Sequence, residues 1–174
     1  WRVPLGGEHN AANAMLAVWV GQAMGLDNDV IAAGLLNVDA PAMRQQVVVA
    51  GPVTVVNDAY NANPDSMLAS LAAFSQLTPA AQRRVAVIGQ MGELGAATDA
   101  AHAEVLAAAL AQHGIGAVIV IGPAFAGAAA TAPPGSLLAV EPLMSDDAAA
   151  RVAAYIKPGD AVLVKGSRSQ AMER

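Results

Sequence analysis

Residues 53–67 read VTVVNDAYNANPDSM, and this stretch decides the class of fold. The apolar run Val53–Val56 is typical of a buried strand, and a helical pattern begins after Asn63. Asn63 can cap that helix, because Pro64 suits the first helical position, where a missing N–H costs nothing. A dense cluster of acids and amides therefore lies between the strand and the helix. In open α/β sheets ligands bind at such carboxyl ends of strands, so the cluster is a candidate site for a polar ligand.

The alternation of strand and helix continues along the rest of the chain. Apolar runs predict central strands at Val53–Val56, Val85–Ile88, Ala117–Ile121 and Ala161–Val164, and a weaker strand at Leu137–Val140. Helical patterns lie between most of them, at Pro64–Gln76, Asp99–Ala111, Pro123–Ala129 and up to Tyr155, with Thr98 and Ser145 as predicted caps. Continuous apolar strands separated by helices indicate a Rossmann-like α/β fold, with a mostly parallel sheet and helices on both faces.

The first part of the chain has a different pattern. Two helical segments are expected, Ala11–Met24 and Val30–Leu36. Asp39-Ala40-Pro41 is typical of a connector, so we expect a domain boundary there, between residues 1–40 and 41–174. Two short apolar runs then flank Gly51-Pro52, which predicts a β-hairpin at the start of the second domain.

The composition is that of a folded protein with small-molecule partners. Hydrophobic residues make up 55% of the 174 residues and charged residues 13%, which is ample material for a core. The net charge of -5 disfavours nucleic acid and anionic membranes as partners. The sequence has no cysteine, so disulfides, thiolate metal sites and a cysteine nucleophile are excluded. No apolar run reaches the roughly 18 residues of a membrane span and no signal peptide is evident, so we expect a cytoplasmic protein.

Four polar residues are candidates for a nucleotide site. Asn10 and Asn13 are three positions apart and share a helix face, where two amides can contact the edge of a base such as adenine. The alternative is that they cap their own helix. Arg44 is either a solvated surface residue or a contact for phosphate or ribose, which its planar fork of donors suits. Asp58 ends an apolar strand, and it is either a turn residue or an acceptor for ribose hydroxyls.

A second candidate site follows the last predicted strand, at Lys165-Gly166-Ser167-Arg168. Two cations at the carboxyl end of a strand can hold a carboxylate or a phosphate, although a basic surface turn has the same composition. Gly89–Gly95 also follows a strand, but Met91 stands where a dinucleotide-binding loop needs glycine, so a nicotinamide cofactor is not expected. The three histidines are far apart in the sequence, which predicts no metal site, and His102 inside a helix is expected to be structural.

Four short motifs stand in order along the chain. They are EHNAANA at Glu8–Ala14, YNANPDSM at Tyr60–Met67, GELG at Gly92–Gly95 and KGSR at Lys165–Arg168, with Met172-Glu173 shortly after. Together they resemble the Mur ligases, the ATP-dependent amide-forming enzymes of peptidoglycan synthesis. The first motif is similar to an element at the end of the central ATPase domain of that family. The second is specific to the member that adds D-alanyl-D-alanine.

The resemblance implies an activity for the complete enzyme. ATP, with Mg²⁺, would phosphorylate the terminal carboxylate of UDP-N-acetylmuramoyl-tripeptide, and the amine of D-alanyl-D-alanine would attack the acyl phosphate. Asn10 and Asn13 would contact adenine, while Arg44 and Asp58 would contact the phosphate or ribose side of ATP. This role belongs to the synthesis of the cell wall, and so to cell shape and cell division.

The resemblance also assigns the contacts to the substrates. The residues concerned belong to the second and fourth motifs, and they are Tyr60, Asn61, Asn63, Lys165 and Arg168. No catalytic residue and no metal ligand is assigned within the chain. Two positions depart from the pattern of the family, because Met43 replaces the usual glycine before Arg44 and Gln90 stands where aspartate is often found.

The phosphate-binding loop of the family, G-x-x-G-K-[ST], is not present in these 174 residues. We therefore expect a fragment, in which residues 1–40 end the central ATPase domain and residues 41–174 form the C-terminal domain. The fragment alone is expected to be inactive, and the metal ligands are expected outside it. The alternatives are another Mur or folylpolyglutamate-type ligase, or a non-catalytic nucleotide-binding module with a Rossmann-like sheet. The upstream coding sequence would distinguish these alternatives, since a ligase needs that loop.

Overall fold

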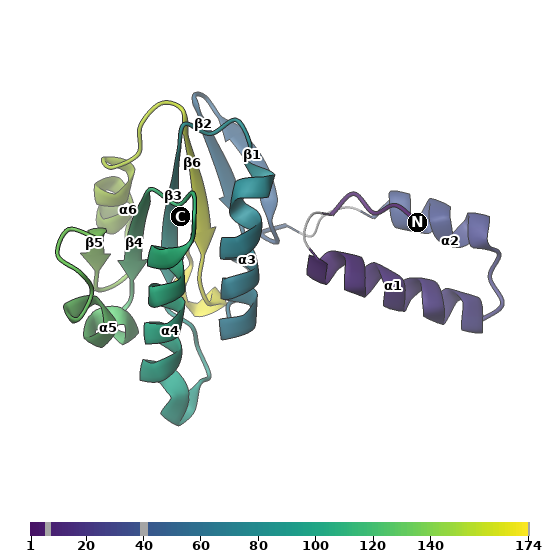
Figure 1. Cartoon of the computed structure of the whole chain (residues 1–174), viewed down its shortest axis with the longest axis horizontal. Coiled ribbons are helices and arrows are strands. Elements are labelled where there is room, and N and C mark those ends of the chain that lie inside the picture. Colours follow the sequence, from purple (N-terminus) through teal and green to yellow (C-terminus); the bar gives the residue numbers. More distant parts are fainter. Residues whose placement is uncertain (6–7, 39–41, 174) are drawn as a thin grey trace. The chain divides into compact units, whose positions relative to one another are not determined.

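The structure, a computed structural model, describes residues 1–5, 8–38 and 42–173. The chain divides into two compact units, Trp1–Pro41 and Ala42–Arg174, which are drawn in Figure 1. The expected connector Asp39-Ala40-Pro41 lies outside the described residues. No helix in the described ranges is long and apolar enough to cross a membrane.

The first unit contains two helices, α1 (Glu8–Ala23) and α2 (Asn28–Leu36). Both predicted helices are confirmed, and each begins slightly earlier than expected. Val18 of α1 packs against Ile31 and Leu35 of α2, and these three side chains are buried. Many other large apolar side chains of the unit remain exposed, among them Met15, Leu16, Trp19, Val20, Met24, Leu26, Val30 and Leu36.

The second unit is built on a six-stranded sheet with the strand order β1-β2-β6-β3-β4-β5. The strands are β1 (Gln46–Ala50), β2 (Val53–Asn57), β3 (Arg83–Gly89), β4 (Ala117–Ile121), β5 (Leu137–Glu141) and β6 (Asp160–Lys165). β1 pairs with β2 in antiparallel orientation, which confirms the hairpin, and every other pair is parallel. The four predicted central strands and the weaker fifth one are all present, so the Rossmann-like α/β prediction is confirmed.

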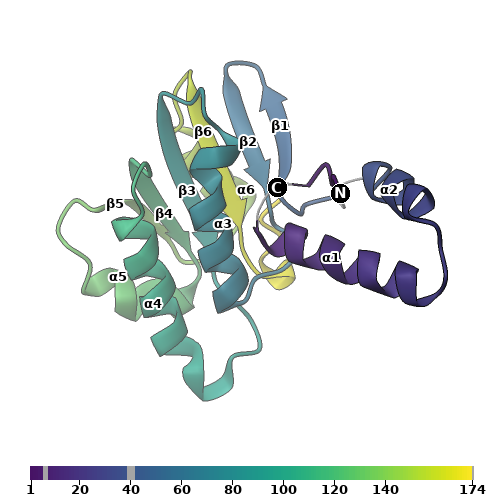
Figure 2. The same ribbon diagram turned by 45° about the vertical axis from the view of Figure 1, so that its right-hand side comes forward.

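Helices cover both faces of this sheet, as predicted. They are α3 (Pro64–Leu77), α4 (Thr98–Ala111), α5 (Ala126–Ala130) and α6 (Asp146–Ala153), and short 3-10 turns η1 (Gly95–Ala97), η2 (Pro123–Phe125) and η3 (Arg168–Gln170) complete the unit. Figures 1 and 2 show α3, α4 and α5 in front of the sheet and α6 behind it. Along β3 the side chains alternate, so that Ala86 and Ile88 join the core under α3 and α4, whereas Val85 and Val87 join the core under α6.

The helix caps follow the predictions at two positions out of three. The side chain of Asn63 accepts a hydrogen bond from Ser66 N–H at 2.8 Å, and Ser145 accepts one from Ala148 N–H at 3.1 Å. The prediction that Thr98 caps α4 is wrong. The turn η1 leads directly into the helix, so Thr98 is already helical, and its hydroxyl donates to the carbonyl of Gly95 at 2.8 Å.

Candidate functional site

The candidate site lies where three neighbouring parallel strands end. β2, β6 and β3 are adjacent in the sheet, so the segments that follow them meet at one edge. These segments line an open groove of about 740 Å³. The lining residues are Tyr60, Asn61, Ala62 and Asn63 after β2, Gly92, Glu93 and Leu94 after β3, and Ser167, Arg168 and Ser169 after β6. Four of the predicted substrate-binding residues therefore line one groove.

Asp58 and Lys165 lie beside this groove and form a buried ion pair. Lys165 Nζ is 2.8 Å from Asp58 Oδ2, and their side chains are only 4% and 10% exposed. Lys165 Nζ also donates to the carbonyl of Asn61 at 3.1 Å. The pair therefore joins the ends of β2 and β6 and holds the segment that forms one wall of the groove.

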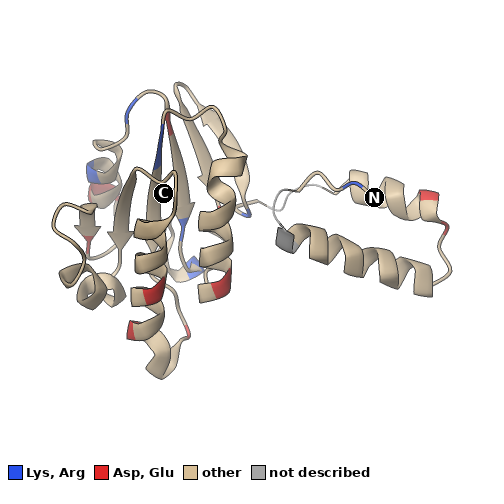
Figure 3. Ribbon diagram, in the orientation of Figure 1, with Lys and Arg blue, Asp and Glu red and all other residues tan. Residues whose placement is uncertain are grey.

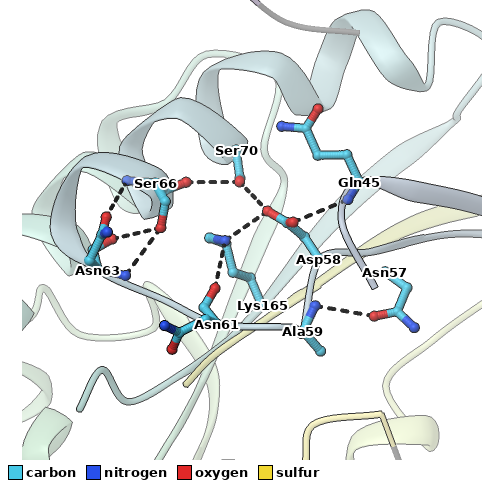
Figure 4. Close-up of polar contacts among 9 residues, drawn as sticks. All are labelled: Gln45, Asn57, Asp58, Ala59, Asn61, Asn63, Ser66, Ser70 and Lys165. Atoms are coloured by element: carbon cyan, nitrogen blue, oxygen red, sulfur yellow. Dashed lines mark hydrogen bonds and ion pairs between the residues drawn. The ribbon is translucent and has the colours of Figure 1, made fainter. Parts of the chain in front are cut away.

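Two further groups complete the environment of the carboxylate, as Figure 4 shows. The hydroxyl of Ser70 donates to Asp58 Oδ2, and the backbone N–H of Gln45 donates to Asp58 Oδ1 at 3.1 Å. Three donors thus satisfy a carboxylate that is shielded from water. The sequence analysis missed Ser70, although a serine on the buried face of a helix, beside Met67 and Leu71, is a recognisable signal.

The segment before β1 is bound to the same wall. Tyr60 N–H donates to the carbonyl of Met43 at 3.0 Å, and the guanidinium of Arg44 lies 4.3 Å from the centre of the Tyr60 ring. That distance is typical of a cation–π contact. Met43 has a φ of 59°, in the left-handed region that glycine adopts most easily. This conformation explains why glycine is usual at this position in the family that the sequence resembles.

Arg168 lines the groove and also contacts two neighbouring side chains. Its Nη1 lies 3.1 Å from Glu173 Oε1 and 3.2 Å from the sulfur of Met43. The side chain is 56% exposed, so the ion pair with Glu173 is a weak surface pair. Within the described ranges, these contacts leave Nε and Nη2 for a ligand.

The chain passes so closely at the ends of β3 and β6 that glycine stands at the last residue of β3, Gly89, and directly after β6, at Gly166. A Cβ atom added to Gly166 would lie 3.0 Å from Gly89 Cα and 2.8 Å from the side chain of Met172. A Cβ atom added to Gly89 would lie 2.6 Å from the sulfur of Met172. Side chains at either position would therefore push apart the strands that carry the groove.

The segment after β3 is fixed by His102, which the sequence analysis expected to be structural. His102 is fully buried in α4, and its Nε2 accepts a hydrogen bond from Met91 N–H at 2.9 Å. Its Nδ1 lies 2.7 Å from the carbonyl of Thr98, so Nδ1 carries the proton. Ser167 N–H donates to the carbonyl of Gln90 at 3.0 Å and ties this segment to the end of β6.

Asn10 and Asn13 belong to the first unit and lie on α1, where Asn10 is half-buried and Asn13 is exposed. The other predicted site residues all lie in the second unit, around the groove just described. Among the described side chains, no group of three or more acidic or histidine residues gathers in a way that could hold a metal ion.

Residues 43–168 match a protein family described as the Mur ligase, glutamate ligase domain. A curated relative is the UDP-N-acetylmuramoyl-tripeptide--D-alanyl-D-alanine ligase of Treponema pallidum. It is 39% identical over 175 residues, and the alignment covers 99% of this chain and 37% of that protein.

Solved structures point the same way. MurF from Acinetobacter baumannii superposes with a TM-score of 0.80 at 28% identity, over 99% of this chain and 37% of that one. MurF ligase from Thermotoga maritima, solved in complex with ADP, has a TM-score of 0.67 at 25% identity, over 90% of this chain and 34% of that one. The chain therefore spans little more than a third of the length of these relatives.

Proposed function

The chain belongs to the Mur ligase family, and from this premise we propose that it is the C-terminal part of a ligase that uses ATP to add D-alanyl-D-alanine to UDP-N-acetylmuramoyl-tripeptide. The observation that carries the proposal is the gathering of two family motifs, Tyr60–Met67 and Lys165–Arg168, around one groove at the carboxyl edge of the sheet. The relative from Treponema pallidum, which carries that name, supports it. The product would be used in peptidoglycan synthesis in the cytoplasm.

ATP contacts are proposed for each unit by itself. Asn10 and Asn13 would contact adenine, and Arg44, which is exposed, would contact a phosphate. Asp58 would accept a ribose hydroxyl through Oδ1. A carboxylate has about four acceptor positions, and the described donors use three of them, with only one on Oδ1. The ADP complex of the Thermotoga maritima relative supports a nucleotide ligand.

The substrate contacts divide between residues that touch the ligand and a residue that positions them. Tyr60, Asn61, Asn63 and Arg168 line the groove and would touch the substrate. Lys165 is buried and bonded to Asp58 and to the carbonyl of Asn61, so we assign it to holding this wall in place. Arg168 is then the cation that binds an anionic group.

The reaction proceeds through an acyl phosphate. ATP transfers its terminal phosphoryl group to the tripeptide carboxylate and leaves as ADP. The ammonium group of the dipeptide loses a proton, and the resulting amine attacks the acyl carbon, displaces phosphate and loses a second proton to form the amide. The side chains of this chain would bind and orient the dipeptide and the nucleotide, which raises the chance of a productive encounter. The phosphate-binding loop would belong to another part of the ligase, because the 174 residues contain no G-x-x-G-K-[ST] sequence. We propose that the Mg²⁺ ligands lie there too, since the described side chains form no cluster of three ligating groups.

We propose that residues 1–40 end the central ATPase domain and that residues 41–174 form the C-terminal domain, a boundary one residue before the division between the two compact units. The exposed apolar side chains of α1 and α2 support this proposal. A large amount of exposed apolar surface is typical of a surface that packs against other protein.

Phosphate release by the full-length protein tests the function. With ATP present, release should require both UDP-N-acetylmuramoyl-tripeptide and D-alanyl-D-alanine, and mass spectrometry should detect the pentapeptide product. Release that depends instead on glutamate and a folate acceptor would favour a folylpolyglutamate-type ligase. ATP binding without release under any of these conditions would favour a non-catalytic module. The 174-residue chain alone should release no phosphate.

A further inference from the structure

One negatively charged and one positively charged side chain line the groove. Among its ten described lining residues, the charged ones are Glu93, after β3, and Arg168, after β6. β3 and β6 are neighbours in the sheet, so the two side chains come from adjacent strand ends. The remaining polar lining groups are uncharged amides and hydroxyls. A ligand that matches this arrangement carries one negative and one positive charge a short distance apart.

The structure around Glu93 holds it in an unusual conformation. Its φ is 61°, in the left-handed region that non-glycine residues rarely adopt. The segment that carries it is fixed on two sides, because Met91 N–H is bonded to His102 and the carbonyl of Gln90 accepts from Ser167 N–H. Gly92 lies so close to Ser167 that an added Cβ would be 3.1 Å from the hydroxyl. The backbone is thus firmly anchored next to a residue whose side chain lines the groove.

We propose that Glu93 binds the ammonium group of the incoming dipeptide while Arg168 binds its carboxylate, so that the groove recognises a short zwitterionic peptide by both charged ends. This inference rests on the proposed function and adds Glu93 to it. Charge-assisted hydrogen bonds at both ends are strong and directional, and they reject analogues that lack either charge. The contacts act in binding, so they affect KM for the dipeptide more than kcat.

The test uses the full-length ligase with Glu93→Gln, which removes the charge and keeps the shape of the side chain. KM for D-alanyl-D-alanine should rise about tenfold or more, the effect of losing one charge-assisted hydrogen bond. KM for ATP should stay the same. Glu93→Asp, which keeps the carboxylate, should restore part of the affinity. Glu104→Gln, a change to an exposed acid of α4 outside the groove, is the matched control and should leave KM for the dipeptide unchanged.

Modified dipeptides assign each charge to its residue. N-acetyl-D-alanyl-D-alanine, which lacks the ammonium group, should inhibit the wild type weakly, with an inhibition constant about tenfold or more above KM for the dipeptide. In Glu93→Gln the inhibition constant of this analogue should become similar to KM for the dipeptide. In Arg168→Met the inhibition constant should remain about tenfold or more above KM. The dipeptide amide lacks the carboxylate, so the wild type should bind it more weakly than the dipeptide. This difference should disappear in Arg168→Met and remain in Glu93→Gln.

The outcomes separate the two proposals. If the wild type ligates the dipeptide and Glu93→Gln matches it in KM and in discrimination against the N-acetyl analogue, the inference about Glu93 is overturned and the proposed function stands. If the wild type ligates no dipeptide, the proposed function is overturned and the inference with it.

Discussion

At the scale of single residues, the site depends on the pairing of Asp58 with Lys165. Both side chains are almost completely buried. Burial of two charges costs desolvation free energy, which is offset only when further hydrogen bonds satisfy both ions. Ser70, the backbone of Gln45 and the carbonyl of Asn61 supply these bonds. Removal of one ion therefore leaves the other buried without its counter-ion.

We expect Asp58→Ala and Lys165→Met each to lower the free energy of unfolding by about 3–5 kcal/mol, because each leaves a buried charge unpaired. The double variant should lose less than the sum of the two single losses. Urea unfolding of the chain, followed by circular dichroism, measures these changes. Fluorescence is unsuitable because both tryptophans, Trp1 and Trp19, lie in the first unit. Additive losses would show that the two charges do not interact.

The location of these residues could be predicted from the sequence, but their pairing could not. A local apolar run followed by a polar residue is enough to place Asp58 and Lys165 at strand ends. The pairing joins residues 107 positions apart, and it requires β2 and β6 to be neighbours. The pattern of apolar runs carries no information about which strands are adjacent. For the same reason the sequence could not predict that Glu93 lines the groove, because its position there depends on β3 lying beside β6.

At the scale of elements, the start of α3 links stability to the groove. Asn63 caps the helix, and the N–H of Asn63 donates to the hydroxyl oxygen of Ser66 at 3.1 Å, so the two residues form a capping box. This feature was predictable because all its groups lie within four consecutive residues. Thr98 was mispredicted because the 3-10 turn before α4 moves the start of the helical backbone ahead of the threonine.

Asn63→Ala should lower the free energy of unfolding by about 1 kcal/mol through loss of the cap. It should also raise KM for the dipeptide in the full-length ligase, because Asn63 lines the groove. Ser145→Ala is the matched control, since Ser145 caps α6 in the same way and is absent from the described lining of the groove. It should lower stability by a similar amount and leave KM unchanged. Equal KM values for both variants would show that Asn63 acts only as a cap.

The segment after β3 depends on α4 through His102. Replacing His102 with leucine should cost about 1–3 kcal/mol, because the N–H of Met91 is left buried without an acceptor. His102→Gln, whose side-chain oxygen can reach the position of Nε2, should recover part of the loss. Hydrogen exchange at the Met91 amide should be faster in the leucine variant than in the glutamine variant. Equal exchange in the two variants would argue against the role of this bond.

At the scale of the whole second unit, two ion pairs connect elements of the fold without lining the groove. Arg83, on β3, makes paired hydrogen bonds to Asp160, at the start of β6. Arg151, on α6, makes paired bonds of 2.9 and 2.7 Å to Glu141, at the end of β5. In Figure 3 the basic residues are scattered over several elements rather than gathered on one. The two ion pairs therefore connect different elements, β3 with β6 and α6 with β5.

Both ion pairs make the free energy of unfolding depend on pH. Hydrogen bonds from Arg83 lower the pKa of Asp160 below its ordinary value of 3.8, and those from Arg151 lower the pKa of Glu141 below 4.5. A carboxyl group with a lowered pKa in the folded state binds protons less readily there than in the unfolded chain. Its contribution to stability is thus fully present above the ordinary pKa. It is lost as the pH falls through the lower, folded pKa.

The melting temperature of the chain should therefore fall as the pH drops below about 4.5, where the unfolded chain starts to take up protons at these two groups. The double variant Asp160→Asn and Glu141→Gln should melt at a lower temperature near neutral pH, because both ion pairs are gone. Its melting temperature should also fall less steeply between about pH 5 and pH 2, since neither position can titrate. Glu104→Gln, which changes an exposed acid of α4, should keep the slope of the wild type. Parallel curves for the double variant and the wild type would show that acid destabilises the protein through other carboxyl groups.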